Sequence, residues 1–191
     1  MLEKKLGELN RDVLRRIFLY IAYKVEGQGY DPKDPAGETI YGITKKWYPE
    51  FYEKLKTALE NNDKKELETA IFNSYSEIYK KSLSEYLPYP LNVTHFDFYF
   101  NAGNHSFEAL QKLLKHFGRY LGKIDGIFGK HSKKALDIFL KEDYDFNNKF
   151  FYYSLYNYFR RNFYLDNPEK RYIIGWINRV QKIDKLCLTE L

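Results

Sequence analysis

Glu26 is the residue whose position in this sequence most favours chemistry. Four apolar side chains recur at helical spacing before it: Val13, Ile17, Ile21 and Val25. This spacing predicts a helix over residues 10–25, and the glycines that begin at Gly27 predict its end. A carboxyl at such a junction can lie against nonpolar surface, where its neutral form is favoured, and can then donate a proton near neutral pH. Helix-terminal glutamates are also common as ordinary solvated residues.

The glycine- and proline-rich loop after Glu26 contains further polar side chains that could assist a proton donor. Asp34 offers a second carboxylate, Thr39 a hydroxyl and Glu38 a third acid. Each also has an ordinary interpretation: an Asp-Pro turn for Asp34, a hydroxyl that satisfies the loop backbone for Thr39, and an exposed charge for Glu38. Spacing alone does not decide between these interpretations.

The run from Glu26 to Thr44 reads EGQGYDPKDPAGETIYGIT. It resembles the signature of glycoside hydrolase family 108, which has a pattern like E-G-G-Y followed by D-P-x-G-x-T-x-Y-G-I-T. Members of this family are N-acetylmuramidases found in phage endolysins and bacterial release proteins. Gln28 interrupts the first element and Ala36 replaces a usual glycine. The acidic residues, the threonine and the Y-G-I-T block are all present, so the resemblance implies an active enzyme.

Further motifs in the same order extend the resemblance through the second half of the chain. Residues 95–103 (HFDFYFNAG) resemble F-D-x-x-x-N-x-G, and residues 110–111 match an L-Q pair. Residues 124–129 (IDGIFG) resemble the D-G-x-x-G turn of the family's peptidoglycan-binding-like region, and residues 175–180 (GWINRV) match a closing G-W-x-x-R-V. The resemblance therefore covers roughly residues 14–183.

The resemblance implies a reaction and a role for Glu26. Glu26 would protonate the glycosidic oxygen of the β-1,4 bond between N-acetylmuramic acid and N-acetylglucosamine in peptidoglycan. The order of Glu26, Asp34 and Thr39 is also similar to that of phage-type lysozymes, in which a carboxylate and a hydroxyl can position an attacking water. Asp34 and Thr39 are therefore the predicted catalytic partners, and the inverting or retaining course stays open.

Three residues are predicted to bind substrate. Tyr30 and Tyr41 flank the catalytic loop, and Asn101 carries an amide suited to N-acetyl groups. The 19 Tyr and 15 Phe residues suit a carbohydrate groove because aromatic faces stack on sugar rings, although half-buried packing is the commoner use of tyrosine. Trp176 and Arg179 of the closing motif are expected to lock the last helix against the core.

Helical periodicity continues through most of the chain, and no segment requires a large sheet. The sequence therefore predicts a mostly α, lysozyme-like helical fold with a possible small β-hairpin in the catalytic loop region. Asp63 with Glu66 predicts a capping box at one helix start, and Asn167 with Pro168 predicts the start of the last helix.

The expected domain organisation follows from two prolines. Pro88 and Pro90 form a corner that interrupts helix. We expect a catalytic lysozyme-like lobe over 1–90 and a helical peptidoglycan-binding-like lobe over 91–191. At 191 residues, the two lobes should pack as one compact unit.

The formal net charge of +5 favours an anionic partner. Because Lys and Arg are dispersed among acids, bacterial peptidoglycan is the predicted partner and nucleic acid is not. Neither metal nor cofactor is predicted, because the histidines and Cys187 lack the spacing of a triad or a metal site. The histidines are expected at ordinary helix or surface positions: His95, His105, His116 and His131. A monomer is expected.

The sequence also suggests where the protein acts. Residues 1–7 are charged and lack an apolar core with a cleavage site, so no conventional signal peptide is predicted. Residues 150–159 form too short an apolar stretch to span a bilayer, so no stable membrane insertion is expected. These features suggest a phage or prophage endolysin that stays in the host cytoplasm until release and then acts on the cell wall.

Two other functions remain open. The D-G-x-x-G turn also occurs in pure binding domains, so the chain could be a non-catalytic cell-wall-binding or virion structural module. The positive charge would also suit a nucleic-acid-binding protein, which predicts steeply salt-dependent DNA affinity and no preference for peptidoglycan. Bond cleavage in peptidoglycan distinguishes a muramidase from both.

Overall fold

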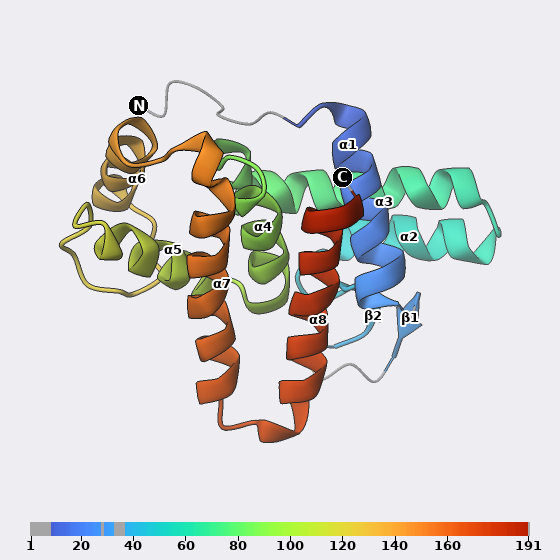
Figure 1. Cartoon of the computed structure of the whole chain (residues 1–191). Coiled ribbons are helices and arrows are strands. Elements are labelled where there is room, and N and C mark those ends of the chain that lie inside the picture. The colour runs from blue at the N-terminus through green and yellow to red at the C-terminus, as the bar shows by residue number, and fades with distance from the viewer. Residues whose placement is uncertain (1–8, 28, 33–36, 191) are drawn as a thin grey trace.

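The computed structural model describes residues 9–27, 29–32 and 37–190. Within these ranges the chain forms eight α-helices and a small antiparallel sheet (Figure 1). The helices are α1 (Arg11–Tyr20), α2 (Pro49–Glu60), α3 (Lys64–Lys81), α4 (Leu91–Ala102), α5 (His105–His116), α6 (Lys130–Glu142), α7 (Lys149–Asp166) and α8 (Ile173–Lys185). The strands are β1 (Tyr30–Asp31), β2 (Thr39–Ile40) and β3 (Ile43–Thr44). The predicted mostly α fold, with a small sheet in the loop region after Glu26, is confirmed.

The helices form pairs around α4, as Figure 1 shows. α7 and α8 run antiparallel, side by side. α2 and α3 form a second hairpin, in which α3 packs against α1. α5 and α6 lie at the opposite end of the molecule. The sheet lies near the end of α1 and packs against α2, and α8 packs against residues 21–26, so segments far apart in the sequence meet around Glu26.

The first helix forms where its periodicity predicts. The Asn10 side chain accepts a hydrogen bond from the backbone N–H of Val13 at 2.9 Å and caps the start of α1. The helix continues beyond Tyr20 as a π-helical segment over Ile21–Glu26 and ends at Gly27, where φ is +75°. Glu26 is therefore the last helical residue before the loop, as the sequence predicts. π-helical turns are rare and often occur at functional sites.

The sheet is built around β2, which pairs antiparallel with both β1 and β3. Thr39 lies opposite Asp31 on one side and Thr44 on the other. Tyr41 and Gly42 form the two-residue turn between β2 and β3, with φ of +47° and +73°. Positive φ at both positions is typical of the tightest hairpin turns. The turn therefore folds sharply and presents its backbone to the neighbouring elements.

Two clusters of buried hydrophobic residues stabilise the fold. One gathers side chains of α1, α2, α3 and the sheet, and the other those of α5, α6 and α7. α4 contributes to both, since Phe96 belongs to the first and Phe98 to the second. Ile183 and Leu186, at the end of the chain, return to the first cluster. Segments on both sides of residue 90 thus share a core, and the division into lobes at that residue stays a prediction.

The two predicted helix starts have different outcomes. The Asp63 carboxylate accepts a hydrogen bond from the backbone N–H of Glu66 at 2.9 Å, so the predicted cap of α3 is confirmed. The last helix, by contrast, begins at Ile173 and not at Asn167. The Asn167 side chain accepts a hydrogen bond from the N–H of Glu169 at 2.9 Å, and a single 3₁₀ turn then precedes α8. This side chain closes a turn in competition with the helix.

His95 on α4 is completely buried, so it does not occupy an ordinary surface position. Its Nε2 lies 2.9 Å from the carbonyl oxygen of Ser82, which can only accept, so this nitrogen carries the proton. Its Nδ1 lies 2.8 Å from the Tyr156 hydroxyl, whose proton is shared between this nitrogen and the carbonyl oxygen of Ser106 at 3.1 Å. Burial lowers the pKa of His95 to about 4. The folded protein therefore holds this ring in its neutral form.

Acidification is expected to destabilise the protein through His95. Its folded pKa of about 4 lies below the unfolded value of about 6.5, so the unfolded chain takes up the proton first. The contribution of His95 to stability is complete above about pH 6.5 and is lost as the pH falls toward about 4, for a total of about 3 kcal/mol. Urea denaturation across this range measures the loss.

Two histidine variants provide the comparison for this acid effect. His95→Gln should lose less stability than the wild type on acidification, because the titrating group is gone. His116→Gln, at an exposed position of α5, should keep the wild-type pH dependence. Identical pH dependence in both variants would contradict the prediction.

Candidate active site

The carboxyl group of Glu26 lies between an arginine and the β2–β3 turn. Its side chain is 18% exposed, and its Oε1 lies 2.7 Å from Nη1 of Arg179 on α8. Oε1 is buried and has no hydrogen-bond partner among the described residues, so Arg179 contacts it closely without hydrogen-bond alignment. The other oxygen, Oε2, lies toward Gly42. One carboxyl oxygen is thus paired with a cation, and the other faces the turn.

Gly42 allows the turn to approach this carboxyl. A Cβ atom at Gly42 would lie 2.5 Å from Cε1 of Phe100 and 2.9 Å from Cδ of Glu26. Both distances are too short for a real carbon contact, and the φ of +73° also disfavours any other residue. The glycine of the Y-G-I-T block is therefore required for the close approach of backbone, aromatic ring and carboxyl.

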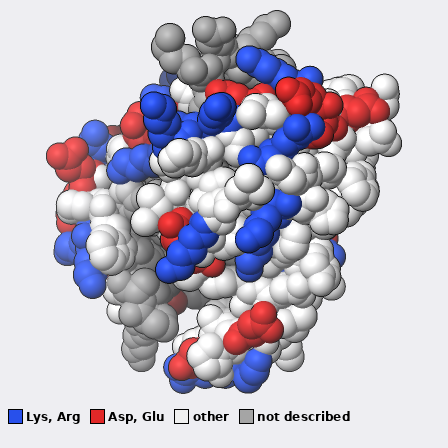
Figure 2. All heavy atoms as spheres, turned by 90° about the vertical axis from the view of Figure 1, so that its left-hand side faces the viewer, with Lys and Arg blue, Asp and Glu red and all other residues white. Residues whose placement is uncertain are grey.

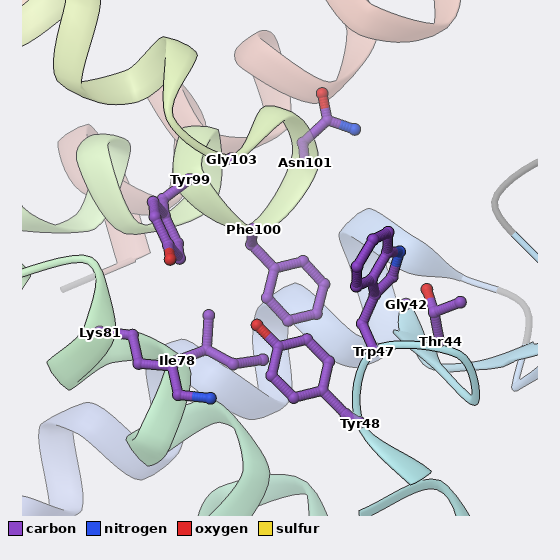
Figure 3. Close-up of a pocket in the computed structure, with 10 residues that line it drawn as sticks. All are labelled: Gly42, Thr44, Trp47, Tyr48, Ile78, Lys81, Tyr99, Phe100, Asn101 and Gly103. Carbon is purple, nitrogen blue, oxygen red and sulfur yellow. The ribbon is translucent and has the colours of Figure 1, made fainter. Parts of the chain in front are cut away.

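A cavity of about 490 Å³ opens next to this glycine (Figure 3). Its lining comes from the β2–β3 hairpin, the segment before α2 and the ends of α3 and α4: Gly42, Thr44, Trp47, Tyr48, Ile78, Lys81, Tyr99, Phe100, Asn101 and Gly103. Figure 3 shows the rings of Trp47, Tyr48 and Phe100 around the same space. The Lys81 Nζ lies 4.9 Å from the centre of the Tyr48 ring. The cavity thus combines aromatic faces with a hydroxyl, an amide and a cation.

Arg179 also binds a second carboxylate, that of Asp97 on α4. Its Nε lies 3.1 Å from both oxygens of Asp97, and its Nη2 lies 2.8 Å from Oδ1. Burial alone would raise the pKa of Asp97, but the positive charges of Arg179 and Arg160 outweigh it and lower that pKa. Asp97 is therefore ionised and ties α8 to α4, as expected for Arg179 from the sequence. The contact of Arg179 with Glu26 was not predicted.

Of the two predicted catalytic partners of Glu26, one lies within the described residues. Thr39 is buried in the middle of the sheet, opposite Thr44, which lines the cavity. Asp34 lies outside the described residues. The catalytic roles of Asp34 and Thr39 therefore stay predictions.

The three predicted substrate-binding residues lie in different surroundings. Asn101 lines the cavity, and its Oδ1 accepts a hydrogen bond from the hydroxyl of Tyr164 at 2.8 Å. Tyr30 is exposed on β1 and donates a hydrogen bond to Glu38 at 2.7 Å. Tyr41 is buried in the first core cluster. Asn101 belongs to the cavity lining, although its amide points away from the aromatic rings in Figure 3, and Tyr30 and Tyr41 lie outside the lining. All three binding roles stay predictions.

Sequence reasoning missed several residues that line the cavity, among them Trp47, Tyr48, Lys81 and Tyr99. A chain with 19 Tyr and 15 Phe offers many aromatic candidates, so the tyrosines carry little signal. Trp47 carries more, because it is one of two tryptophans and follows the Y-G-I-T block closely. Its large exposed indole fits a binding surface better than a core position.

The L-Q pair and the D-G-x-x-G turn form one structural unit. The buried Gln111 accepts hydrogen bonds from the N–H groups of Asp125 and Gly126, both at 3.0 Å. The Asp125 carboxylate accepts from the N–H of Ile127 at 2.9 Å and closes the turn. These bonds give both motifs a structural role, and wall binding by this region stays a prediction.

Three observations concern cofactors and partners. Within residues 9–27, 29–32 and 37–190, no three His, Cys, Asp or Glu side chains gather closely enough to hold a metal ion. Among the described helices, none combines the length and the apolar character needed to cross a membrane. On the face shown in Figure 2, Lys and Arg side chains are interspersed with acidic and uncharged ones, in keeping with the dispersed charge of the sequence.

The helical fold with its small antiparallel sheet, in which a carboxyl at a helix end adjoins an aromatic cavity, is consistent with a lysozyme-like glycoside hydrolase. Comparison with protein families agrees: residues 20–103 match the family described as Glycosyl hydrolase 108. The protein is a glycosyl hydrolase of the peptidoglycan-lysozyme type. No curated protein and no solved structure matches the chain.

Proposed function

We propose that the protein is an N-acetylmuramidase that cleaves the β-1,4 bond between N-acetylmuramic acid and N-acetylglucosamine in peptidoglycan, with Glu26 as the general acid. One observation carries this proposal: Gly42 lies against the Glu26 carboxyl and also lines the aromatic cavity. A proton donor therefore adjoins a surface suited to sugar rings. The family match over residues 20–103 supports glycoside hydrolysis at this place.

The proposed proton donor is Oε2 of Glu26. Oε1 is paired with Arg179, whereas Oε2 lies on the side of Gly42 and the cavity. Transfer of the proton from Oε2 to the glycosidic oxygen lets the bond to the leaving sugar break without a free alkoxide. Water completes the hydrolysis at the sugar carbon, and Asp34 and Thr39 are the proposed groups that position it.

The cavity lining suits a glycan that carries acetamido and acidic groups. The exposed ring of Trp47 and the ring of Tyr48 offer faces for stacking on sugars. The ammonium of Lys81 can pair with a carboxylate of N-acetylmuramic acid or its peptide, and Nδ2 of Asn101, whose Oδ1 binds Tyr164, can donate to an N-acetyl group. N-acetylglucosamine lacks such an acid, so Lys81 favours the muramic acid unit.

The proposed biological setting is a phage or prophage endolysin that acts on the cell wall after its release from the host cytoplasm. Its net charge of +5 favours association with an anionic wall. We propose that it acts as a monomer, because a single chain carries both Glu26 and the cavity beside it.

Mass spectrometry of reduced muropeptides tests the proposed bond. Purified peptidoglycan incubated with the protein should gain N-acetylmuramic acid reducing ends. New N-acetylglucosamine reducing ends instead would show a glucosaminidase and overturn the proposed bond. Binding to several wall types without the release of fragments would favour the non-catalytic wall-binding module.

A further inference from the structure

Arg179 contacts two carboxylates that come from different parts of the chain. Its Nε and Nη2 bind Asp97 at 2.8–3.1 Å, and its Nη1 lies 2.7 Å from Oε1 of Glu26. A planar guanidinium that a carboxylate binds at two nitrogens has a fixed orientation. Asp97 therefore determines where Nη1 of Arg179 lies, and Glu26 meets a cation that is already in place.

Asp97 is fixed in turn by Arg160 on α7. Nη2 of Arg160 lies 2.5 Å from Oδ2 of Asp97, and both side chains are 0% exposed. Arg160 also donates to Oγ1 of Thr94 at 3.2 Å and lies 5.2 Å from the ring centre of Phe98. Buried charged side chains are stable only when each has a partner of opposite charge. The positions of Arg160, Asp97 and Arg179 are therefore tightly constrained. Side chains of two helices, α4 and α7, thus hold Arg179 of α8 in one position.

The pairing distinguishes the two oxygens of Glu26. Oε1 lies against Arg179, and a Cβ atom at Gly42 would lie 3.0 Å from Oε2, so Oε2 points toward the turn that lines the cavity. Arg179 therefore fixes the rotation of the carboxyl and leaves Oε2 for the transferred proton. When that proton leaves, the negative charge on Glu26 forms beside a preorganised cation, which stabilises it without rearrangement.

We infer that Arg179 is a positioning residue for Glu26, anchored by Asp97 and Arg160, so that α8 is part of the catalytic centre. This inference rests on the proposed function of Glu26 as general acid. Arg179 lies outside residues 20–103, which match the family. The hydrolase domain therefore depends on a side chain from the end of the chain.

Kinetics of two Arg179 variants test the inference. Arg179→Met should lower kcat about 10²-fold, as the loss of a preorganised electrostatic partner typically does. KM should stay within about threefold, because the cavity lining is unchanged and only an interaction at the reacting group is lost. Arg179→Lys, which keeps the charge, should retain a higher kcat than Arg179→Met. A kcat of Arg179→Met equal to that of the wild type would overturn the inference.

Arg161→Met is the matched control. Arg161 on α7 lies 2.5 Å from the carboxylate of Asp184 on α8, so it also joins these two helices by an ion pair. This pair does not include Glu26 or Asp97. Because half-exposed ion pairs contribute little, the control should keep kcat within about twofold of the wild type. A kcat loss equal to that of Arg179→Met would assign the effect to helix packing and overturn the inference.

A double variant separates positioning from a purely structural role. If Arg179 acts through Glu26, adding Arg179→Met to Glu26→Gln should change the residual rate by less than about twofold. A further large fall would overturn the inference. Thermal denaturation checks that each variant folds. If Arg179→Met does not fold, Arg179→Lys is combined with Glu26→Gln instead, and the same change in residual rate is measured. Failure of the proposed function is seen separately, as a wild type that releases no N-acetylmuramic acid ends or a Glu26→Gln variant that keeps full activity.

Discussion

Replacing Glu26 by Gln is expected to lower the rate of peptidoglycan cleavage about 10²–10⁴-fold, the typical contribution of a general acid. The amide has nearly the shape of the carboxyl, but it cannot donate an acidic proton, and it loses the charge contact with Arg179. The substitution therefore removes the chemistry while keeping the packing against Gly42. Initial rates of soluble muropeptide release from purified walls measure the effect.

Glu68→Gln is the matched control for this variant. Glu68 is 22% exposed and pairs with Arg15 at 3.1 Å, which is close to the burial and pairing of Glu26. Because such partly exposed ion pairs contribute little to stability, the control should keep its rate within about twofold of the wild type. A Glu26→Gln variant that keeps more than about a tenth of the wild-type rate would assign the acid to another carboxyl. Asp34 and Glu38 would then be the next residues to replace.

Much of the helical fold could be predicted because its determinants are local. The apolar spacing before Glu26 predicted the first helix and its end, and Asp63 predicted the start of α3. The start of α8 was placed too early because Asn167 followed by proline is also a common helix start. Whether its side chain caps a helix or closes a turn depends on the packing around it. That packing is set by α7 and α8 together, and a local pattern does not contain it.

The candidate site could be predicted only at its centre. Glu26 stands out by its position at a helix end, and the Y-G-I-T block marks the turn beside it. The need for Gly42 becomes visible only when α4 places Phe100 against the turn. Arg179 was assigned to helix packing because its contact with Glu26 depends on how Asp97 orients it. Ion pairs between distant segments follow from tertiary packing, which single-sequence spacing does not encode.

Replacing Asp97 by Ala is expected to destabilise the folded protein by about 3–5 kcal/mol. The Asp97 carboxylate is 0% exposed and faces two guanidinium groups, those of Arg160 at 0% and Arg179 at 11% exposure. Its removal leaves these two desolvated cations with one acidic partner, Glu26. A buried charge without a partner is among the costliest defects in a protein. Urea denaturation at neutral pH measures the loss as a lower midpoint at unchanged slope.

Asp143→Ala is the control for the effect of burial. Asp143 also binds an arginine at two nitrogens, since Arg119 donates to it at 2.6 and 2.8 Å. The Arg119 side chain is 32% exposed, so water can solvate its charge when the carboxylate is removed. The expected loss is about 1 kcal/mol or less. Both variants replace an arginine-bound aspartate by alanine, so the difference between their losses of stability measures the effect of burial.

Removing Arg160 together with Asp97 is expected to restore part of the lost stability. The double variant Asp97→Ala, Arg160→Met deletes the unpaired buried charge along with its partner, and apolar replacements of buried ion pairs are often tolerated. Should Asp97→Ala cost no more than Asp143→Ala, water must reach these guanidinium groups in the folded protein. Arg179 would then be free to move, and its position against Glu26 would no longer be fixed by the buried network.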